Sequence, residues 1–460
     1  MIRLFRVYFP SRLLLLAALE TILISAALTI AAAIWFGSDA ELRLVYENGF
    51  AGIAVATGIC VLCMYYHDLY NTMVIRNHRD VRLRAIQAFG TTCVILALLY
   101  YAFPAVRLNR GVVVFGLVLT GVGLTGSRTL FVRFNGWTHL NQRTMLLGRG
   151  PVADLLMQQI ESRPELGIDI VGYLERASAP NGHVGALKRL GEPEEVEQLV
   201  VRERVSRVVF SADAASSLPI ESLLRLKANG VVVQDATVAY ESVTGQVPVS
   251  SLRPTWLLFS DGFRISKTRL LYKRIAAVVG SLVGLVLCAP LMALVALAVR
   301  LDSPGPVIFR QQRVGKDGKR FTIYKFRSMR VGSERDPRPA EENDSRFTRV
   351  GRRIRQMRLD ELPQLYNILR GDMCFVGPRP FVPEAEEFLA ATIPMYRGRW
   401  AVRPGATGWA QIQRGYCATL QDNIEKLGFD LFYIENLSMG LDFLILFQTV
   451  KILLLGRGAR

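Results

Sequence analysis

Two adjacent carboxylates, Asp360 and Glu361, stand in the run Arg355-Gln-Met-Arg-Leu-Asp-Glu-Leu-Pro-Gln364. Pro363 follows closely, and proline is accommodated in the first turn of a helix, where its missing N–H would be unpaired anyway. We therefore expect Asp360 at a helix N-terminus, where free N–H groups and the dipole stabilise an anion. We also expect Asp360 to stay ionised at neutral pH, and the following helix to bury a stripe made of Leu362, Leu365, Ile368 and Leu369.

A simpler interpretation of the same pair needs no chemistry. Asp360 is then an N-cap and Glu361 a first-turn acid, both of which are common at helix starts. The rest of the chain decides between the two interpretations, because a site for phosphate chemistry also requires arginines and lysines held nearby.

Composition places the chain in a membrane. Its 460 residues carry a formal net charge of +17 and 51% are hydrophobic, with a mean hydropathy of +0.26. An apolar and basic chain of this kind is typical of an integral membrane protein that faces anionic lipid or anionic substrates. The six cysteines show no disulfide framework, and the four histidines show no metal-ligand spacing.

Residues 1–135 are predicted to form a membrane α-helical bundle. Four apolar segments, at 13–36, 50–66, 85–103 and 111–132, each approach the ~20 residues that span hydrocarbon as a helix. Arginines follow the second and fourth segments, so the positive-inside rule places the N-terminus and everything after residue 135 in the cytoplasm. Charged residues are nearly absent inside the segments, which argues against a transporter.

Residues 140–245 are predicted to form a Rossmann-like α/β domain. Strands at 144–148, 168–174, 208–211 and 231–234 alternate with helices at 152–161, 194–203 and 220–227. The first strand-to-helix turn, Gly148-Arg-Gly-Pro-Val-Ala153, departs from a dinucleotide fingerprint at Pro151 and Ala153. No Tyr-x-x-x-Lys pair occurs in the chain. We therefore expect a packing or regulatory domain without a redox cofactor.

A linker, 246–266, leads to a mostly α catalytic region at 267–460. Its apolar segment, 272–300, is long enough to span a membrane. The chain that follows is strongly basic, with sixteen Lys and Arg against six Asp and Glu between Arg310 and Arg358. This basic block stays cytoplasmic if the segment enters the membrane and returns, bent at Pro290. The alternative is a spanning helix that Pro290 merely kinks. The last apolar stretch, 437–455, is expected to lie in the interface or pack on the domain.

The basic block, with aromatics interleaved, could hold nucleic acid or a nucleotide diphosphate. Attachment to a membrane segment favours a membrane-associated phosphate substrate and no nucleic acid. Arg379 and Arg403 stand in rigid Pro/Gly turns, where an arginine fork suited to phosphate oxygens has little freedom to lose.

From about residue 267 onwards the chain resembles the bacterial sugar transferases that are monotopic polyprenyl-phosphate phosphoglycosyl transferases. The motifs that carry the resemblance are Asp302-Ser-Pro-Gly-Pro306, Lys325-Phe-Arg-Ser-Met329, Leu359-Asp-Glu-Leu-Pro-Gln364, Gly371-Asp-Met373, Gly377-Pro-Arg-Pro380 and Arg403-Pro-Gly with Gln411. Four spans and a middle domain are similar to long-form members, which initiate exopolysaccharide, capsule or O-antigen repeat units.

This resemblance implies transfer of a hexose-1-phosphate, glucose or galactose, from a UDP-sugar to undecaprenyl phosphate, with release of UMP. It implies that Asp360 is the nucleophile of an aspartyl-phosphosugar intermediate and that Glu361 accepts a proton or helps to hold Mg²⁺ with Asp360. Arg355 matches an arginine thought to bind the lipid phosphate. The other phosphate-binding candidates are Lys325, Arg327, Arg379 and Arg403. Pro290 matches the proline of a re-entrant helix, although the preceding residue is Ala289 where the family commonly has Ser.

The resemblance also implies a multi-pass protein of the bacterial inner membrane with its catalytic domain on the cytoplasmic face. We expect a homodimer and contacts with membrane lipid and other polysaccharide-assembly proteins. Two alternatives remain open: an NAD-dependent enzyme that modifies nucleotide sugars, and a non-catalytic scaffold for polysaccharide assembly.

Overall fold

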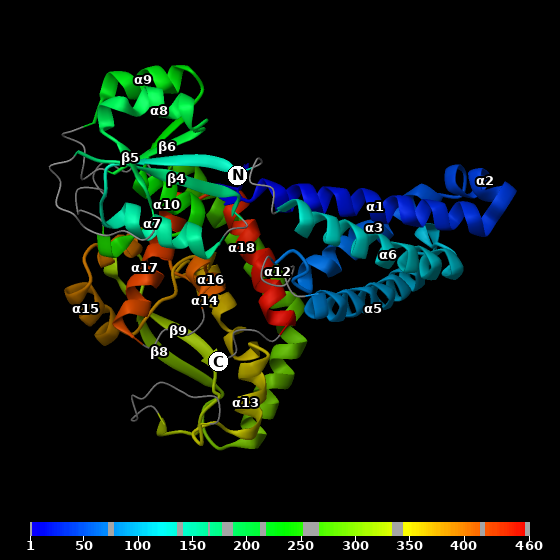
Figure 1. The fold of residues 1–460 in the computed structure, drawn as a ribbon. Helices are drawn as coiled ribbons and strands as arrows, with labels where there is room; N and C mark the ends of the chain where they lie inside the picture. Colours follow the sequence, from blue (N-terminus) through cyan, green and yellow to red (C-terminus); the bar gives the residue numbers. More distant parts are fainter. Residues whose placement is uncertain are drawn as a thin grey trace.

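A computed structural model describes the chain over residues 2–71, 78–135, 141–163, 166–176, 187–211, 218–251, 266–333, 344–414 and 419–455. Within these ranges, five helices are long and apolar enough to cross a membrane. The helices of the N-terminal part form an elongated bundle that extends to one side of the remaining elements (Figure 1). Most of the linker predicted at 246–266, including Pro254, Trp256 and Phe259, lies outside the described residues.

The N-terminal part begins with a small hairpin, β1 (Ile2–Leu4) and β2 (Val7–Phe9). The long helices are α1 (Ser11–Phe36), α3 (Gly49–Tyr66), α5 (His78–Ala102) and α6 (Arg110–Asn135), with the short α2 (Ala40–Val45) at the far end. Each long helix overlaps one of the four apolar segments predicted from the sequence. Ile24 and Leu28 of α1 pack in the bundle core with Val112 of α6.

The bundle contains one buried ion pair that the sequence analysis did not anticipate. Arg128 of α6 donates to both carboxylate oxygens of Glu20 on α1, at 2.8 Å and 3.1 Å. Glu20 is fully buried and Arg128 is 6% exposed. Tyr70, beyond the end of α3, lies with its ring 5.9 Å from the Arg128 guanidinium carbon. Since an ion inside an apolar bundle must be paired, this pair fixes the register of α1 against α6.

The middle part is a parallel five-stranded sheet in the order β5-β4-β3-β6-β7. Its strands are β3 (Gln142–Leu147), β4 (Ile168–Leu174), β5 (Arg189–Gly191), β6 (Arg207–Phe210) and β7 (Val232–Asp235). The first strand, β3, lies centrally, and the winding direction reverses between β3 and β6. Four of these strands agree with the sequence prediction, whereas β5, only three residues long, was missed.

Helices cover both faces of this sheet. The helices are α7 (Pro151–Ser162), α8 (Val196–Arg202), α9 (Ile220–Ala228) and α10 (Ala236–Thr244). One core joins α7 and α10 to the sheet, and a second core joins α8 and α9 to its other face. The sequence analysis predicted the first three helices but not α10, which Asp235 caps through a 2.7 Å bond from the Thr237 amide.

The C-terminal part combines helices with short strands. The helices are α12 (Lys267–Asp302), α13 (Arg349–Gln356), α14 (Gln364–Arg370), α15 (Pro383–Thr392), α16 (Trp409–Gln413), α17 (Leu420–Glu435) and α18 (Met439–Leu454). The antiparallel strands β8 (Ile308–Val314) and β9 (Arg320–Phe326) form a hairpin, and the parallel pair is β10 (Cys374–Val376) with β11 (Gly405–Thr407).

The middle and C-terminal parts are joined through α10 and the residues that follow it. Trp409 donates its indole N–H to the Gly245 carbonyl at 2.7 Å. The Val247 amide donates to the Gly428 carbonyl at 3.1 Å. Val247 is buried in the same core as Trp409, so the two parts share apolar packing as well as hydrogen bonds.

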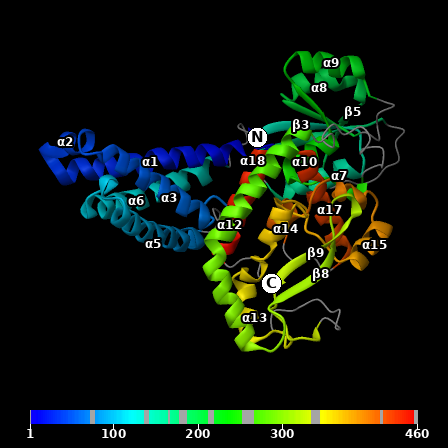
Figure 2. The same cartoon turned by 180° about the vertical axis from the view of Figure 1, so that it is seen from behind.

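Helix α12 continues through Pro290 and packs against the hairpin at both ends. Ala277 lies in a core with Phe321 of β9, and Val299 lies in a core with Phe326 of the same strand. Figure 2 shows the axis of α12 turning part-way along its length. A proline inside the helix, which removes one backbone hydrogen bond, allows this bend.

The face of α12 turned away from the hairpin is apolar and exposed. The exposed apolar residues of α12 are Leu271, Tyr272, Ile275, Val279, Leu282, Val283, Val286, Leu287, Leu291, Leu294, Leu297 and Leu301. An apolar face of this length is expected to lie in lipid. In α18, Leu441 and Ile445 are buried against the domain, while Phe443 and Val450 are exposed. This helix packs on the domain, one of the two arrangements expected for it.

Candidate active site

Asp360 lies in a single turn of 3-10 helix, Leu359–Glu361, that precedes α14. Arg358, just before it, adopts a left-handed conformation with φ of 58°, and this reverses the chain direction after α13. Helix α14 begins only at Gln364. Asp360 was expected at a helix N-terminus, but it lies one turn before α14 and is not its N-cap, because the chain forms a tight 3-10 turn before Pro363.

The buried face of α14 also differs from the predicted stripe. Ile368 is buried, but Leu362, Leu365 and Leu369 are only half-buried. The polar side chain of Asn367 is fully buried instead, because its amide bridges the hairpin. It accepts from the Tyr324 amide at 3.1 Å and donates to the Thr322 carbonyl at 2.7 Å. These bonds fix the start of α14, and with it the acidic pair, against β9.

The carboxyl of Asp360 is 7% exposed, and its Oδ1 has no hydrogen-bond partner among the described residues. Burial raises the pKa of Asp360, and the neighbouring Glu361 charge raises it further, while Lys325, Arg355 and Arg358 oppose the shift. Arg355 and Arg358 favour the ionised form, as expected, but burial and Glu361 shift the pKa of Asp360 the other way. An acceptor oxygen that is both desolvated and unpartnered is a more reactive nucleophile than one held by hydrogen bonds.

Glu361 has the opposite environment. Its Oε1 accepts from Lys325 at 3.0 Å and from Arg379 at 3.2 Å. Burial alone would raise the pKa of Glu361, but Lys325, Arg379 and Arg358 together hold it below its usual range. Burial lowers the pKa of Lys325, and the Glu361 charge partly restores it. Glu361 thus holds two cations in place and is a poor proton acceptor at neutral pH.

Arg355 reaches the acidic pair from the last turn of α13. A close approach of α13 to the segment after β9 makes this possible, since a Cβ on Gly351 would lie 1.9 Å from the Ser328 carbonyl oxygen. The Arg355 guanidinium carbon lies 4.8 Å from the centre of the Phe347 ring. Burial lowers the pKa of Arg355, whereas the Asp360 charge raises it.

Arg379 is placed by a junction of two glycine-containing turns. A Cβ on Gly377 would lie 2.4 Å from the Arg403 carbonyl oxygen, and a Cβ on Gly405 would lie 2.1 Å from the Gly377 nitrogen. The Gly377 amide donates to the Thr407 carbonyl at 2.9 Å. The turns Gly377-Pro-Arg-Pro380 and Arg403-Pro-Gly405 therefore cross with their backbones in contact, which only glycine allows.

One predicted phosphate-binding residue, Arg327, binds backbone carbonyls instead. Arg327 is 6% exposed and donates to the carbonyls of Ser303 and Pro304, at 2.6 Å and 2.9 Å. It therefore fixes the turn after α12. The charge of Arg403 acts on the buried Cys374 thiol. Arg403 is not among the principal cations that shift the pKa of either member of the acidic pair.

The structure adds Arg313 and Arg358, which sequence reasoning did not single out as site residues. Burial and the neighbouring Arg379 charge lower the pKa of Arg313 to about 10, although Glu361 and Glu386 oppose the shift. Arg313 stands in the run Gln311-Gln-Arg-Val-Gly315, whose basic and aromatic surroundings were noted without assigning a residue. With Lys325, Arg355 and Arg379, five cations surround two carboxylates, which is the charge balance of a site for a polyanion.

No group of three or more His, Cys, Asp or Glu residues suited to a metal is found in the described part of the chain. The unpartnered Asp360 Oδ1 does fit a magnesium ion that arrives with a diphosphate, because Mg²⁺ commonly takes one or two carboxylates together with phosphate oxygens.

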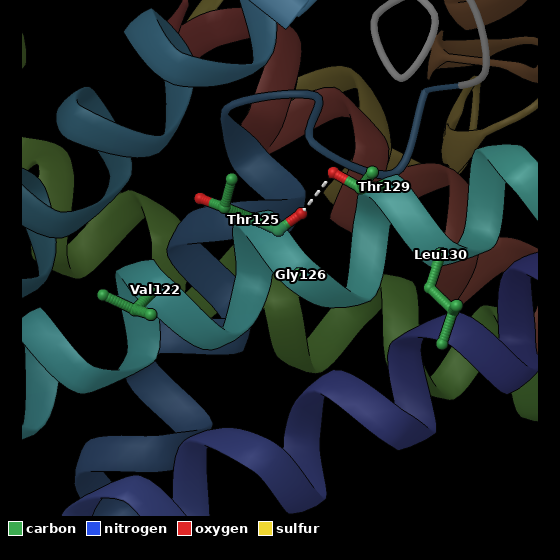
Figure 3. A pocket seen from close by; sticks show the side chains of 5 residues that line it. All are labelled: Val122, Thr125, Gly126, Thr129 and Leu130. Carbon is green, nitrogen blue, oxygen red and sulfur yellow. Dashed lines mark hydrogen bonds between the residues drawn. The ribbon is translucent and has the colours of Figure 1, made fainter.

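A surface groove of about 520 Å³ lies far from these residues, on α6. Its lining is Val122, Thr125, Gly126, Thr129 and Leu130, all from one helix (Figure 3). Thr125 and Thr129 donate their hydroxyls to carbonyls of the same helix, at 2.8 Å and 2.7 Å. This groove therefore offers no free hydroxyl hydrogen to a polar ligand and is not the site of chemistry.

The bacterial sugar transferase family model matches residues 268–456, and a CoA-binding domain model matches residues 66–233. The chain is 34% identical to the UDP-glucose:undecaprenyl-phosphate glucose-1-phosphate transferase of Escherichia coli, over 72% of this chain and 73% of that protein. The enzyme of the same name from Xanthomonas campestris is 33% identical over 86% of this chain and 85% of its own. The chain belongs to the bacterial sugar transferase family.

Another member is more similar over a shorter range. A UDP-N-acetylgalactosamine-undecaprenyl-phosphate N-acetylgalactosaminephosphotransferase from Aeromonas hydrophila is 42% identical over 48% of this chain, and the match spans about half of that protein, 52%. Bacterial sugar transferases with different sugars in their names thus resemble this chain. The sequence-based recognition of the family is confirmed.

Proposed function

We propose that this protein transfers a sugar-1-phosphate from a UDP-sugar to undecaprenyl phosphate and releases UMP, as the initiating step of exopolysaccharide, capsule or O-antigen synthesis. The named activities of its relatives support this substrate pair. One observation carries the proposal: a desolvated carboxylate oxygen of Asp360 without a partner, beside a Glu361 that holds Lys325 and Arg379.

The first half of the reaction uses this arrangement directly. An Asp360 oxygen attacks the sugar-bearing phosphorus of the UDP-sugar, forming a phosphorus–oxygen bond. The bond from that phosphorus to the bridging oxygen breaks, and UMP leaves with the bridging oxygen and its electron pair. Lys325 and Arg379 stabilise the charge that develops on the diphosphate, since donors held in advance need not reorganise during the reaction.

The second half regenerates the enzyme. A phosphate oxygen of undecaprenyl phosphate attacks the same phosphorus, the acyl-phosphate bond to Asp360 breaks, and the carboxylate is restored. Arg355 orients the lipid phosphate. Glu361 keeps its two cations in place and does not act as the proton acceptor, because its pKa is held low. The charge of the doubly ionised lipid phosphate makes such a base unnecessary.

Mg²⁺ is proposed to enter with the donor diphosphate and to be held by Asp360 and Glu361. When bound, it neutralises diphosphate charge and makes UMP a better leaving group. Five surrounding cations disfavour a metal that arrives alone, so the ion and the diphosphate should bind together.

The apolar face of α12 is proposed to enter the membrane and return, so that both of its ends lie on the cytoplasmic side of the bacterial inner membrane. The packing of Ala277 and Val299 on one hairpin supports this, because a straight spanning helix would hold its ends on opposite sides. The bend at Pro290 is accommodated although Ala289 replaces the family's usual serine. A homodimer and contacts with other polysaccharide-assembly proteins remain part of the proposal.

The middle sheet is proposed to be Rossmann-like and to serve packing or regulation without a redox cofactor. Trp409, a residue of the Arg403–Gln411 motif, binds the segment after α10, which supports a packing role. Purified full-length protein with stoichiometric NAD would contradict this.

The function is tested with purified full-length protein in lipid nanodiscs, undecaprenyl phosphate, Mg²⁺ and a panel of UDP-sugars. UMP release that requires both the lipid phosphate and one particular UDP-sugar is expected, and Asp360→Asn is the negative control. Absence of UMP release with every UDP-sugar would contradict the proposal.

A further inference from the structure

We infer that Arg313 and Arg399 are positioning residues that together fix Arg379 against Glu361. The inference rests on the proposed function and adds to it two arginines that no family motif above contains. Arg313 lies on β8, and Arg399 lies in the 3-10 helix Tyr396–Ala401.

The backbone of the Gly377-Pro-Arg-Pro380 turn is held at consecutive carbonyls. The Pro378 carbonyl accepts from the Gly405 amide at 3.0 Å, and the Phe381 carbonyl accepts from the Val314 amide at 3.1 Å. Between them, the Arg379 carbonyl accepts from Arg399 Nη2 at 2.8 Å. The Pro380 carbonyl accepts from Arg313 Nη1 at 3.1 Å. Because the two prolines have no N–H, carbonyls are the main means of holding this turn.

Arg399 is itself immobilised. Its side chain is 3% exposed and forms ion pairs with Glu386 at 2.9 Å and Asp430 at 3.0 Å. Its Nη1 also donates to the Tyr396 hydroxyl at 2.6 Å. Two buried carboxylates therefore fix the guanidinium, and Nη2, which binds Asp430, also donates to the Arg379 carbonyl.

Arg313 holds the next carbonyl from the hairpin side. Its Nη2 donates to the Gln311 side chain on the same strand at 2.6 Å, which sets the plane of the guanidinium. Nη1 then points at the Pro380 carbonyl. Since both arginines bind backbone atoms, the Arg379 side chain stays available for Glu361, 3.2 Å away, and for the donor diphosphate.

The test measures steady-state kinetics of Arg313→Met, Arg313→Lys and Arg399→Lys in the full-length protein. Arg313→Met is expected to raise KM for the UDP-sugar about tenfold, the effect of losing one hydrogen bond from a charged donor. KM for undecaprenyl phosphate should change less than twofold. Arg313→Lys should recover part of the loss. Arg399→Lys keeps a cation between Glu386 and Asp430 but loses the bond to the Arg379 carbonyl. It should therefore also raise KM for the UDP-sugar while leaving KM for undecaprenyl phosphate nearly unchanged.

A double-mutant cycle separates positioning from direct binding. In an Arg379→Met background, Arg313→Met should cost less than a further twofold, because its effect acts through Arg379. Arg320→Gln is the matched control: Arg320 lies on the same hairpin and forms an exposed ion pair with Glu387 of α15, so the KM values of this variant should be unchanged. Thermal unfolding of every variant is recorded in parallel.

Additive effects of Arg313→Met and Arg379→Met would overturn the inference, because Arg313 would then bind substrate itself. Equal rises in both KM values together with a lower Tm would also overturn it, as would wild-type KM values in Arg313→Lys and Arg399→Lys. Failure of the proposed function is distinct, since the wild-type protein would then release no UMP.

Discussion

Lys451 of the last helix lies with its Nζ 2.6 Å from Asp68, at the end of the second membrane helix. The same ammonium donates to the Tyr65 carbonyl at 2.8 Å and lies 4.4 Å from the centre of the Tyr65 ring. Phe447, one turn earlier on α18, packs on the same tyrosine at 5.2 Å. The membrane bundle is therefore fastened to the catalytic part by a specific contact as well as by the chain connection.

Replacing Lys451 with Met should loosen this contact. Asp68 keeps its bond to Arg84, so we expect a loss of about 1–2 kcal/mol, less than for an isolated buried charge. Differential scanning fluorimetry in detergent measures it as a lower Tm, with the exposed pair variant Arg320→Gln as the unchanged control. A fragment of residues 267–460 lacks this contact and the Trp409–Gly245 bond, so its stability should be lower. It should retain some activity, because the candidate site residues all lie within it. An unchanged Tm in the Lys451 variant would contradict the prediction.

The Glu20–Arg128 pair provides a prediction about the membrane bundle. Glu20→Gln leaves Arg128 buried and unpaired, which should destabilise the protein by about 3–5 kcal/mol. The double variant Glu20→Met with Arg128→Met removes both charges and should be close to wild type. Thermal unfolding and the yield of folded protein from membranes measure both. If the double variant is as unstable as the single one, the pair contributes more than charge neutralisation.

Periodicity predicted most elements because they bury an apolar face at a regular spacing. The four N-terminal helices and four strands of the middle sheet follow their apolar runs closely. The pattern missed β5, since three residues at a sheet edge show no alternation, and it missed the Glu20–Arg128 pair. In a single sequence, a charge inside an apolar run looks like an exception until its partner on another helix is known.

The candidate site was predicted where neighbours in sequence are neighbours in space. Asp360 and Glu361 are adjacent in the sequence, and Lys325 and Arg379 each lie within a short motif of the family. The sequence did not reveal that burial raises the pKa of Asp360 against its neighbouring arginines, because burial depends on tertiary packing. Arg327 looked like a phosphate ligand from its motif, yet its side chain is buried on the turn after α12. Arg399 gave no sequence signal, since its partners Glu386 and Asp430 lie 13 and 31 residues away.

Topology of α12 is tested by labelling single cysteines placed at positions 268 and 316 in a background without the native cysteines. A membrane-impermeant maleimide should reach both positions from the same side of the membrane, because a re-entrant helix returns to the side it entered. Pro290→Ala should straighten the helix and lower activity. Labelling of the two positions from opposite sides would contradict the re-entrant arrangement.

The acid limb of the pH profile should report Asp360. The carboxylate must be ionised to attack, so kcat/KM for the UDP-sugar should fall as pH decreases through its raised pKa. The Glu361 charge contributes to that rise, so Glu361→Gln should move the limb to lower pH while reducing the rate. Stability behaves differently for the two groups. Because the folded pKa of Glu361 is lowered, its ionised form stabilises the fold at every pH above the pKa of the unfolded chain, and this stabilisation is lost as the pH falls through the folded pKa. The raised pKa of Asp360 has the opposite effect and costs stability at neutral pH.

Asp360 should carry the sugar-phosphate during turnover. Mixing the enzyme with UDP-sugar alone should add a hexose-phosphate to the peptide that contains Asp360, because the second displacement needs the lipid. Asp360→Asn keeps the shape of the side chain but removes its charge and nucleophilicity, so turnover should fall by orders of magnitude while Tm stays close to wild type. Glu361→Gln should also reduce turnover strongly and still permit a slow first half-reaction, since Asp360 remains. Mass spectrometry of the quenched, digested protein detects the adduct, and adding undecaprenyl phosphate should remove it. An active enzyme that never shows the adduct, or an Asp360→Asn variant with near-normal turnover, would exclude this mechanism.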